Sequence, residues 1–393
     1  MGCTLRLVAI FAAVYGLLYA AFGLQSPYLP ALLRGRGLPA PLLGVTLAAS
    51  TAIRVVAGPA IGHAADRLRR HTAILCACAF AAALAGLGYV ALRGFPSLLP
   101  VALLQAALLA PVVPLSDALA STVSARTARF EYGWIRAAGS AAFVAGVSLG
   151  GWVIASAGLI ALPWIAGMVL AVGGAAALLL PPLPAGSRAA ALSAALADLP
   201  LLLRLAPYRR MLLVAALVEG SHALHDSFAV IRWHDAGIDP RVIGLLWSES
   251  VLAEVLVFLL IGPWLLRLLS PGGACALAAG AAALRWTVAA FTTAPAALGL
   301  IQPLHGLTFA LLHLACVRLI VRIVPARLAA TAQSIYGTLC VGAATALVTL
   351  ASGVLYQLVG GIGFLAMAVL CVLALPLCGG LRDGAIALRI PAP

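Results

Sequence analysis

Ionisable side chains inside long apolar segments are the residues of this sequence best suited to chemistry. Glu219, His222 and Asp226 are spaced by three and four residues within the apolar segment 210–233, so on a helix they would share one face. Charged groups are costly in hydrocarbon, and those found there usually serve transport or proton transfer. A row of carboxylate, imidazole and carboxylate could pass a proton along the helix. The alternative is a polar network that only braces the neighbouring helices.

A second group of ionisable residues lies on three later apolar segments. Glu254, Arg285 and His305 each fall near the middle of one of them. Because successive spans run in opposite directions, the three side chains would reach a similar depth and could form one buried cluster. Arg285 would then keep Glu254 ionised until a proton arrives. A fixed ion pair that only stabilises the bundle is the competing interpretation.

The amino-terminal part of the chain offers one acid and arginine combination. Asp117 lies near the inner end of one apolar segment, and Arg136 lies near the start of the next. We expect them at similar depth on adjacent antiparallel helices, where they would pair. Either this pair is structural, or Arg136 is released to hold an anionic or polar group of a substrate. A further arginine, Arg54, also falls within an apolar segment.

The composition shows which kind of protein must position these residues. Of 393 residues, 64% are hydrophobic and only 9% are charged, whereas soluble domains carry about 25% charged residues. Such a chain has no water-soluble surface, so a soluble enzyme is excluded. A spanning helix needs about 20 apolar residues, and polar, proline and glycine interruptions leave twelve runs of that kind. The runs are 6–30, 40–62, 72–93, 97–122, 133–156, 159–181, 210–233, 241–267, 273–293, 296–321, 329–357 and 361–381.

The longest polar interruption predicts how these spans are divided. It covers residues 182–209, a central cytoplasmic loop between six-helix halves at 1–181 and 210–393. All 24 basic residues are arginines, and most of those between spans lie on the same side as the two termini. The positive-inside rule therefore places both termini in the cytoplasm of a bacterial-type inner membrane. The arginines expected on the opposite side are Arg34, Arg36, Arg93 and Arg241.

Sites for metals, cofactors and nucleic acids are not indicated. The eight cysteines form no CxxC pair and no zinc-like spacing, and no glycine-rich phosphate loop occurs. The net charge of +13 would suit nucleic acid only on a soluble basic face, so it indicates membrane topology instead. A membrane-embedded enzyme or sensor would need a reactive cluster or a soluble module. We expect no cofactor, no metal, no nucleic-acid partner and no enzymatic activity.

The loop between the second and third predicted spans carries a recognisable motif. Residues 62–71 read G-H-A-A-D-R-L-R-R-H and resemble the G-x-L-A-D-R-x-G-R-R/K signature of the major facilitator superfamily. Ala64 replaces the leucine, and Arg69 replaces the second glycine. The resemblance implies that Asp66 pairs with arginines across the seam between domains and holds one access state shut, although plain positive-inside charge is the alternative. The residues given this gating role are Gly62, Asp66, Arg67 and Arg70.

Further blocks, in order along nearly the whole chain, resemble the 3-phenylpropionate permease-type branch of the major facilitators. This branch is distantly related to lactose and nucleoside proton symporters. The blocks include P-L-S-D-A-L at 114–119, Arg136, E-G-S-H at 219–222, A-E-V at 253–255, R-W at 285–286, Gln302, His305, His313 and Tyr336. The resemblance implies an all-α fold of twelve transmembrane helices in two six-helix halves. It also implies proton-coupled uptake of a small organic solute, such as an aromatic or other organic acid, by alternating access.

Spacing and resemblance together assign the candidate sites. For proton coupling we expect Glu254, Arg285, His305, Glu219, His222 and Asp226. For substrate binding we expect Arg136, Asp117, Arg285, His222, Gln302 and Tyr336. The expected partners are a small-molecule substrate, a proton and membrane lipid, and we expect a monomer.

The seventh span leaves the substrate open. Where relatives tend to carry two tyrosines, this chain has His225 and Asp226, and Arg232 stands at a later aromatic position. Proton-driven efflux of an apolar or cationic compound is the first alternative, since buried carboxylates such as Glu219 and Glu249 could bind cations. Symport of a sugar or a nucleoside is the second.

Overall fold

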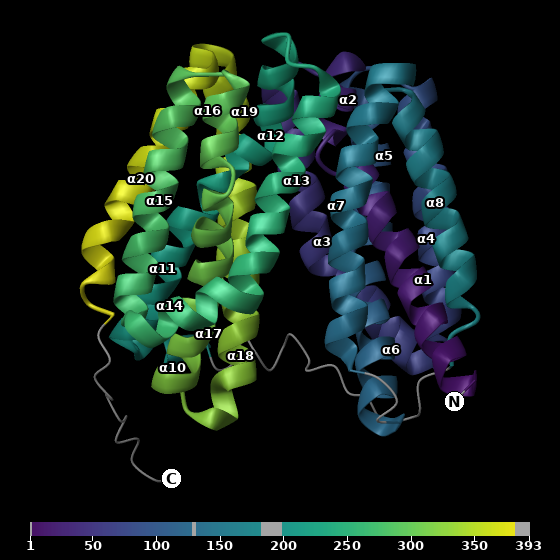
Figure 1. The fold of residues 1–393 in the computed structure, drawn as a ribbon, viewed down its shortest axis with the longest axis horizontal. Coiled ribbons are helices and arrows are strands. Elements are labelled where there is room, and N and C mark those ends of the chain that lie inside the picture. The colour runs from purple at the N-terminus through teal and green to yellow at the C-terminus, as the bar shows by residue number, and fades with distance from the viewer. Residues whose placement is uncertain (1, 128–130, 182–198, 382–393) are drawn as a thin grey trace. The chain divides into compact units, whose positions relative to one another are not determined.

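Figure 1 shows the computed structural model of the chain, which describes residues 2–127, 131–181 and 199–381. These residues form helices and no strands. Hydrocarbon offers the backbone no hydrogen-bond partner, and a helix satisfies its own N–H and C=O groups. The first helices are α1 (Gly2–Gln25), α2 (Leu29–Gly35), α3 (Ala40–Leu68), α4 (His71–Ala91), α5 (Phe95–Leu109), α6 (Val112–Thr127), α7 (Tyr132–Ala157) and α8 (Ala161–Ala177).

The later helices include three π-helical segments. The α-helices are α10 (Leu199–Arg204), α11 (Ala206–Gly220), α12 (His222–Asp235), α13 (Pro240–Leu256), α14 (Gly262–Leu268), α15 (Pro271–Phe291), α16 (Pro295–Ile301), α17 (Leu312–Ile323), α18 (Ala329–Tyr336), α19 (Thr345–Val359) and α20 (Phe364–Cys378). The π-helical segments are Val257–Ile261, Gly306–Leu311 and Gly337–Ala344. Short 3₁₀ turns cover Ala326–Leu328 and Gly360–Gly363.

The helices account for all twelve predicted spans. Nine stretches of the described chain are long and apolar enough to cross a membrane, and Ala161–Ala177 is a shorter apolar helix. One of the nine, Thr331–Cys378, covers the last two predicted runs. The seventh run corresponds to α11 and α12, where ionisable side chains lower the hydropathy. The predicted all-α membrane fold is confirmed.

The chain forms two compact units. Of the described residues, the first consists of 2–127, 131–181, 226–248 and 350–357, and the second of 199–225, 249–349 and 358–381. The first unit therefore includes most of α12, the first part of α13 and residues 350–357 of α19. The predicted division into halves at 182–209 stays a prediction, because residues 182–198 of that loop lie outside the described residues.

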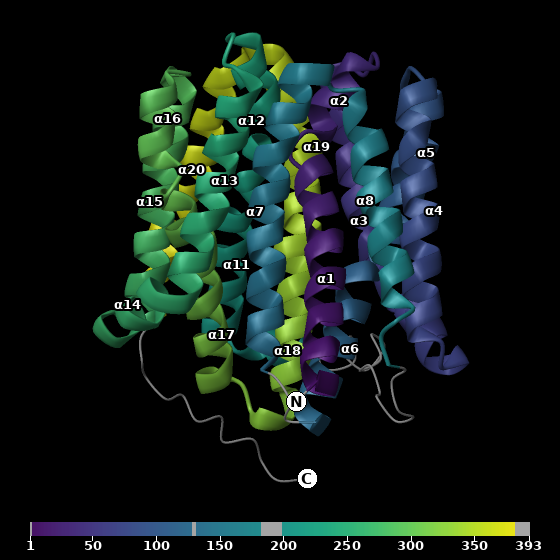
Figure 2. The same cartoon turned by 45° about the vertical axis from the view of Figure 1, so that its right-hand side comes forward.

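Helix α1 supplies much of the core of the first unit. Its side chains Phe11, Val14 and Tyr15 are completely buried, and α1 packs against both α7 and α8. Figures 1 and 2 both show α1 beside α7.

Two glycines allow α1 and α7 to approach closely. A Cβ on Gly146 of α7 would collide with the carbonyl oxygen of Ala20, and a Cβ on Gly23 of α1 would collide with that of Phe143. Small residues at helix crossings are how membrane helices bring their backbones together. The close crossing fixes the aromatic side chains of α1 relative to α7.

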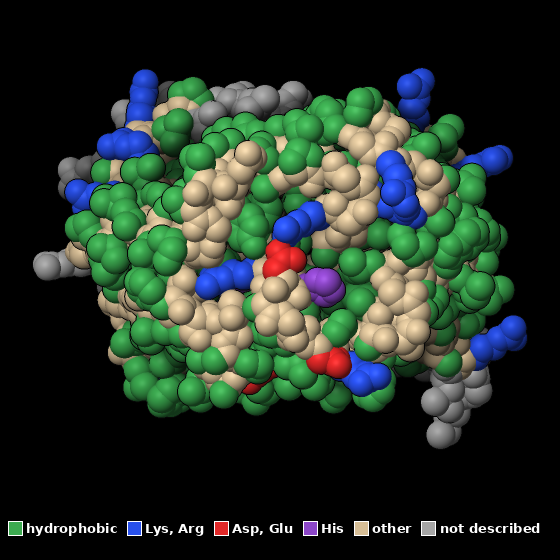
Figure 3. Space-filling view, turned by 90° about the horizontal axis from the view of Figure 1, so that it is seen from above, with side chains coloured by type: hydrophobic (Ala, Val, Ile, Leu, Met, Phe, Trp, Pro, Cys, Tyr) green, Lys and Arg blue, Asp and Glu red, His purple; other side chains and the backbone are tan. Residues whose placement is uncertain are grey.

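One end of the first unit carries charged side chains at its surface. An Arg34 guanidinium nitrogen lies 2.7 Å from a carboxylate oxygen of Asp235, so α2 is joined to α12. Arg241 lies 3.8 Å from Asp239 on the same segment. Figure 3, seen from above, shows arginine and carboxylate side chains near one another on a mainly hydrophobic face. Both pairs are exposed, so each stabilises the fold by less than about 1 kcal/mol.

We expect Gly146→Ala to destabilise the protein, because the added methyl group meets the backbone of α1, which cannot yield as a flexible side chain would. Overpacking of this kind costs about 1–3 kcal/mol. Gly16→Ala is the matched control, since a Cβ at Gly16 has nothing within 4 Å. Thermal unfolding of the purified protein in detergent should show a lower midpoint for Gly146→Ala only. Equal midpoints for the two variants would contradict the close crossing.

Candidate functional site

Arg285 is the centre of the polar cluster in the second unit. It lies on α15 and is completely buried. One terminal nitrogen donates to Nδ1 of His305 at 3.1 Å, and the other donates to the Oε1 of Gln302 at 2.9 Å and contacts Nε2 of His225 at 3.5 Å. The guanidinium carbon also lies 4.6 Å from the ring centre of Trp286. A buried charge needs partners of this kind.

His305 connects this guanidinium to the carboxylate of Glu254. A guanidinium only donates hydrogen bonds, so Nδ1 of His305 must accept, and the ring carries its proton on Nε2. Nε2 lies 3.6 Å from a carboxylate oxygen of Glu254 on α13. The predicted meeting of Glu254, Arg285 and His305 is therefore present, with the imidazole as the link between acid and guanidinium.

His222 joins the same cluster through Thr308. Its Nδ1 lies 3.0 Å from the carbonyl oxygen of Val218, and its Nε2 lies 2.9 Å from the hydroxyl of Thr308. The Thr308 hydroxyl is also 3.2 Å from the carbonyl oxygen of His305. Because that hydroxyl has one proton, it donates to Nε2 when His222 is neutral and to the His305 carbonyl when His222 is protonated. The ring centres of His222 and His305 are 5.3 Å apart.

The other two members of the predicted row on the seventh span lie in different surroundings. Glu219 is buried near the end of α11, and His222 is buried at the start of α12. Asp226 is exposed and belongs to the first unit. A relay through all three residues therefore stays a prediction, whereas His222 has a described connection to the His305 cluster.

Gln302 and Tyr336 each contact one ionisable side chain of the second unit. Gln302 accepts from Arg285, and the Tyr336 hydroxyl lies 3.2 Å from Nδ1 of His313. We expected His313 two turns beyond His305 on the same helical face. The π-helical segment Gly306–Leu311 lies between them, so α-helical spacing does not apply across it, and the two histidines have different partners.

The three π-helical segments of the described chain each follow one of the candidate site residues. Glu254 lies three residues before Val257–Ile261, and His305 and Tyr336 directly precede the other two segments. A Cβ on Gly306 would lie 2.6 Å from the carbonyl oxygen of Ala253. The glycine thus lets the segment after His305 pack against the backbone next to Glu254. Isolated π turns in α-helices are frequent at functional sites.

The predicted ion pair of Asp117 and Arg136 does not form between these described residues of the first unit. Asp117 accepts a hydrogen bond of 2.8 Å from the hydroxyl of Tyr15. Arg136 contacts the Ser140 hydroxyl at 3.4 Å, and its guanidinium lies 4.8 Å from the ring centre of Tyr19. Tyr15 and Tyr19 are stacked, with ring centres 5.7 Å apart. The predicted ion pair is wrong for the described residues. The Tyr15 hydroxyl binds the carboxylate of Asp117, and the Tyr19 ring lies against the guanidinium of Arg136.

Asp66 of the loop motif pairs with a histidine and not with the predicted arginines. A carboxylate oxygen of Asp66 lies 2.8 Å from Nε2 of His71, and none of the described arginines pairs with this carboxylate. Arg69 has a left-handed backbone with φ of +56°, the one positive φ at a described non-glycine residue. That conformation explains why the superfamily signature has a glycine there. The turn at Arg69 brings His71 back to Asp66, while Arg67 and Arg70 are exposed and Gly62 has open space around it.

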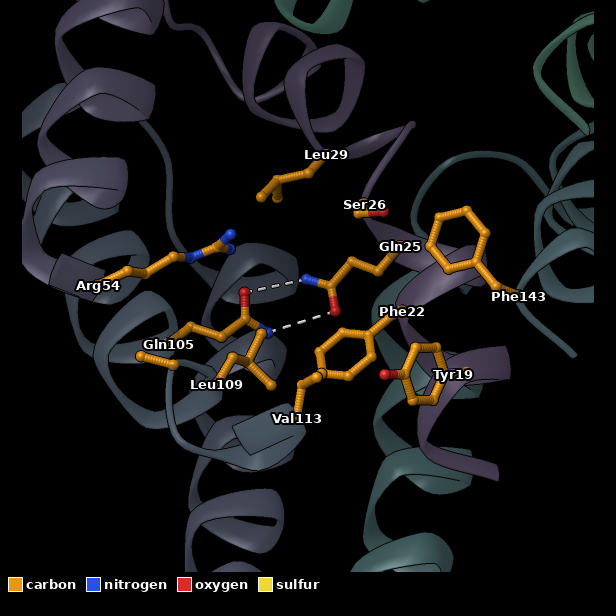
Figure 4. Close-up of a pocket in the computed structure, with 11 residues that line it drawn as sticks. Tyr19, Phe22, Gln25, Ser26, Leu29, Arg54, Gln105, Leu109, Val113 and Phe143 are labelled. Atoms are coloured by element: carbon orange, nitrogen blue, oxygen red, sulfur yellow. Dashed lines mark hydrogen bonds between the residues drawn. The ribbon is translucent and has the colours of Figure 1, made fainter. Parts of the chain in front are cut away.

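A cavity of about 400 Å³ lies in the first unit. Figure 4 shows the polar side chains Arg54, Gln25 and Gln105 on its wall, with the two amides hydrogen-bonded to each other. Gln25 and Gln105 were not among the predicted site residues. Their signal in the sequence is an amide within an apolar run, but they lie on different helices, and spacing does not reveal such pairs. The lining residues are Tyr19, Phe22, Gln25, Ser26, Leu29, Arg54, Gln105, Leu109, Ala110, Val113 and Phe143.

Comparison with known proteins identifies relatives over nearly the whole chain. The family described as "MFS_1 like family" matches residues 8–366. A protein of Escherichia coli K12 named "Probable 3-phenylpropionic acid transporter" is 29% identical over 363 residues, which cover 91% of this chain and 93% of that protein. The "Maltose permease" of Geobacillus stearothermophilus is 28% identical over 237 residues, 60% of this chain and 59% of the permease.

Solved structures support the fold. The nucleoside transporter NupG is similar with a TM-score of 0.84 and 16% identity, over 95% of this chain and 98% of the transporter. The transporter PepTSo gives a TM-score of 0.72 with 13% identity, over 96% and 97% of the two chains. At these identities the likeness concerns the fold alone.

The Thr308 hydroxyl yields a prediction about the cluster. Thr308→Val keeps the shape of the side chain but removes the group that Nε2 of His222 contacts in a completely buried place. Loss of a buried hydrogen-bond partner costs about 1–3 kcal/mol, so the thermal unfolding midpoint should fall. Thr308→Ser keeps the hydroxyl and should stay closer to the parent. A Thr308→Val midpoint equal to that of Thr308→Ser would show that the hydroxyl does not hold His222.

Proposed function

The chain belongs to the MFS_1 like family, and we propose that it is a proton-coupled symporter that takes up a small organic acid by alternating access. The family and the relatives are transporters, so the protein is an integral multi-pass membrane transporter and not an enzyme. The proposal includes a bacterial-type inner membrane with both termini in the cytoplasm. It also includes a monomer that works with a small-molecule substrate, a proton and membrane lipid.

The observation that carries the proposal is the connection from Glu254 through His305 to Arg285. The side chains of Glu254 and His305 are 25% and 16% exposed, whereas Arg285 is completely buried. Glu254 is therefore accessible for exchange of a proton, and the guanidinium is a fixed positive charge. This is the arrangement expected of an acid that loads and releases a coupling proton next to a permanent cation.

The contacts suggest how protonation would act. An ionised Glu254 offsets the charge of Arg285 through the intervening imidazole of His305. Once Glu254 takes up a proton, it becomes neutral, and the positive charge of Arg285 is no longer offset in a poorly screened place. Two conformations that solvate this charge differently would then change in population. His222 adds a second titratable group that Thr308 links to the same backbone.

The acid substrate is supported by the name of the Escherichia coli relative, which gives 3-phenylpropionic acid. The substrate-binding roles that the sequence suggested are kept as part of the proposal. Asp117 and Arg136 are not paired with each other in the described structure, so each retains its charge for a ligand or for gating. The residues concerned are Arg136, Asp117, Arg285, His222, Gln302 and Tyr336.

A ligand panel tests the substrate class. Purified protein would be heated with 3-phenylpropionate, acetate, maltose, uridine or tetraphenylphosphonium, and its unfolding midpoint measured, since a ligand that binds the folded state raises stability. We expect the aromatic acid to raise the midpoint. A shift with maltose or uridine alone would favour sugar or nucleoside symport, and a shift with the cation alone would favour efflux.

We expect Glu254→Gln to abolish uphill uptake driven by a pH gradient and to spare exchange of substrate. Exchange does not require the carrier to return empty, so it does not require loss of the proton. Liposomes containing the protein, labelled 3-phenylpropionate and an internal pH-sensitive dye would report substrate and proton together.

Glu249→Gln is the matched control, because Glu249 lies on the same helix α13 but is not part of the described cluster. Uphill uptake should persist in this variant. If Glu254→Gln still accumulates substrate while Glu219→Gln does not, the proton site belongs to the seventh span.

The proposed gate gives a separate prediction. Asp66→Asn should leave the unfolding midpoint nearly unchanged and lower transport several-fold, because the amide keeps the shape but removes the only carboxylate of the loop. Uptake in liposomes and thermal unfolding would be measured on the same preparation. His71→Gln, which removes the described partner of Asp66, should show a similar loss. Normal uptake in both variants would assign the motif to membrane topology alone.

A further inference from the structure

Arg54 is a charged side chain without a hydrogen-bond or ion-pair partner in the described structure. It lies fifteenth of the 29 residues of α3, halfway along the helix. Its guanidinium has no hydrogen bond or ion pair to any described residue, whereas Arg136 and Arg285 both contact neighbouring side chains. Its five N–H donors are aligned for two parallel hydrogen bonds to a carboxylate. An arginine at this depth is costly unless it faces a polar or ligand-filled space.

The cavity described above gives Arg54 such a space. Figure 4 shows its guanidinium extending into the cavity towards the side where Gln25 and Gln105 meet. The Gln25 amide nitrogen donates to the Oε1 of Gln105 at 3.0 Å, and Gln105 also donates to the carbonyl oxygen of Ala82 at 3.3 Å. Gln105 is only 3% exposed. These contacts hold the two amides in place beside the guanidinium, so one end of the cavity is polar and fixed.

Tyr19 supplies a second polar group on the wall. The residue is 7% exposed, and its buried hydroxyl has no hydrogen-bond partner in the described structure. Figure 4 shows this hydroxyl on the side of the ring that faces the other lining residues. A buried hydroxyl without a partner costs stability, and a ligand oxygen in the cavity would satisfy it.

The remaining wall is apolar and aromatic. Phe22, Phe143, Leu109 and Val113 are lining residues, and Arg54 alone among the eleven is charged. A volume of about 400 Å³ lies within the range of about 300–1,000 Å³ that is usual for small-molecule sites. A cavity with one cationic end and an aromatic body fits a small monocarboxylic acid with an apolar or aromatic body. It does not fit a cation or a fully hydroxylated sugar.

We propose that this cavity is a further binding site on the path of the substrate, in which Arg54 holds the carboxylate, Gln25, Gln105 and Tyr19 surround it with polar groups, and Phe22 and Phe143 cover the apolar body. The inference rests on the proposed function and deepens it, since it names the arginine that selects the acid. Arg136 is the nearest competitor. Its guanidinium contacts the Ser140 hydroxyl and the Tyr19 ring, and Arg136 is not a lining residue of the cavity.

Binding to the purified full-length protein tests this assignment. Titration calorimetry would compare 3-phenylpropionate with 3-phenylpropan-1-ol, which has the same body without the carboxylate. The parent should bind the acid and not the alcohol. Arg54→Gln should weaken acid binding about 10- to 100-fold, the range expected for a charge-assisted bidentate contact. Arg54→Lys keeps the charge but loses the planar fork, so it should recover only part of the affinity.

Control variants separate the site from general effects. Arg93→Gln removes the same charge at an exposed position away from the cavity and should bind like the parent. Tyr19→Phe should weaken binding a few-fold without a loss of folding, and Leu109→Trp should exclude the aromatic acid by filling the cavity. These two variants decide the question if Arg54→Gln does not fold.

The outcomes distinguish this inference from the proposed function. Parent-like affinity in Arg54→Gln, or in both Tyr19→Phe and Leu109→Trp, would overturn the site while leaving proton-coupled acid uptake in place. Loss of binding in Arg136→Gln with full binding in Arg54→Gln would move the carboxylate to Arg136. A parent protein that binds neither 3-phenylpropionate nor acetate, under conditions in which it binds maltose, uridine or the cation, would overturn both.

Discussion

The cost of placing a guanidinium where water cannot reach it governs the arrangement of the second unit. Arg285 is completely buried, and its charge has to be stabilised by the protein alone. Its donors meet His225 of α12 and both Gln302 and His305 of the segment that follows α16, and the Trp286 ring lies against it. The tautomer of His305 follows from this requirement, and so does the nitrogen that His305 presents to Glu254. The geometry of the acid thus depends on the arginine, although the two belong to different helices.

The first unit accommodates its charged side chains in two other ways, since Arg136 is only half-buried and Arg54 is exposed. Arg136 and Asp117 are accommodated by a stacked pair of tyrosines from α1, so an aromatic surface and a phenol hydroxyl replace an ion pair. Arg54 instead lies at the wall of a cavity. The difference is physical: a residue with protein acceptors is already satisfied, while one at a cavity wall depends on water or a ligand for its hydrogen bonds.

The sequence was sufficient for the spans and for the cluster in the second unit. Apolar length identifies spans because the thickness of the bilayer is fixed, and depth along each span brought Glu254, Arg285 and His305 together without knowledge of the packing. It was insufficient where packing across helices decides. The pairing of Asp117 was predicted wrongly because Tyr15 of α1, 102 residues away in the sequence, donates a hydrogen bond to its carboxylate, while the Tyr19 ring lies against Arg136. The Gln25 and Gln105 contact joins residues 80 apart, and uncharged amides gave no sign of it.

The π-helical segments have a consequence for comparing this chain with its relatives. An α-helix advances about 100° per residue, and a turn with i→i+5 hydrogen bonds holds an extra residue. Side chains after Gly306–Leu311 are therefore rotated relative to those before it, compared with an uninterrupted α-helix. A relative without this segment would present a different residue at the same place in space, even where the letters align perfectly. On these helices, equivalence between proteins is a matter of superposed coordinates, and identical letters can be in non-equivalent places.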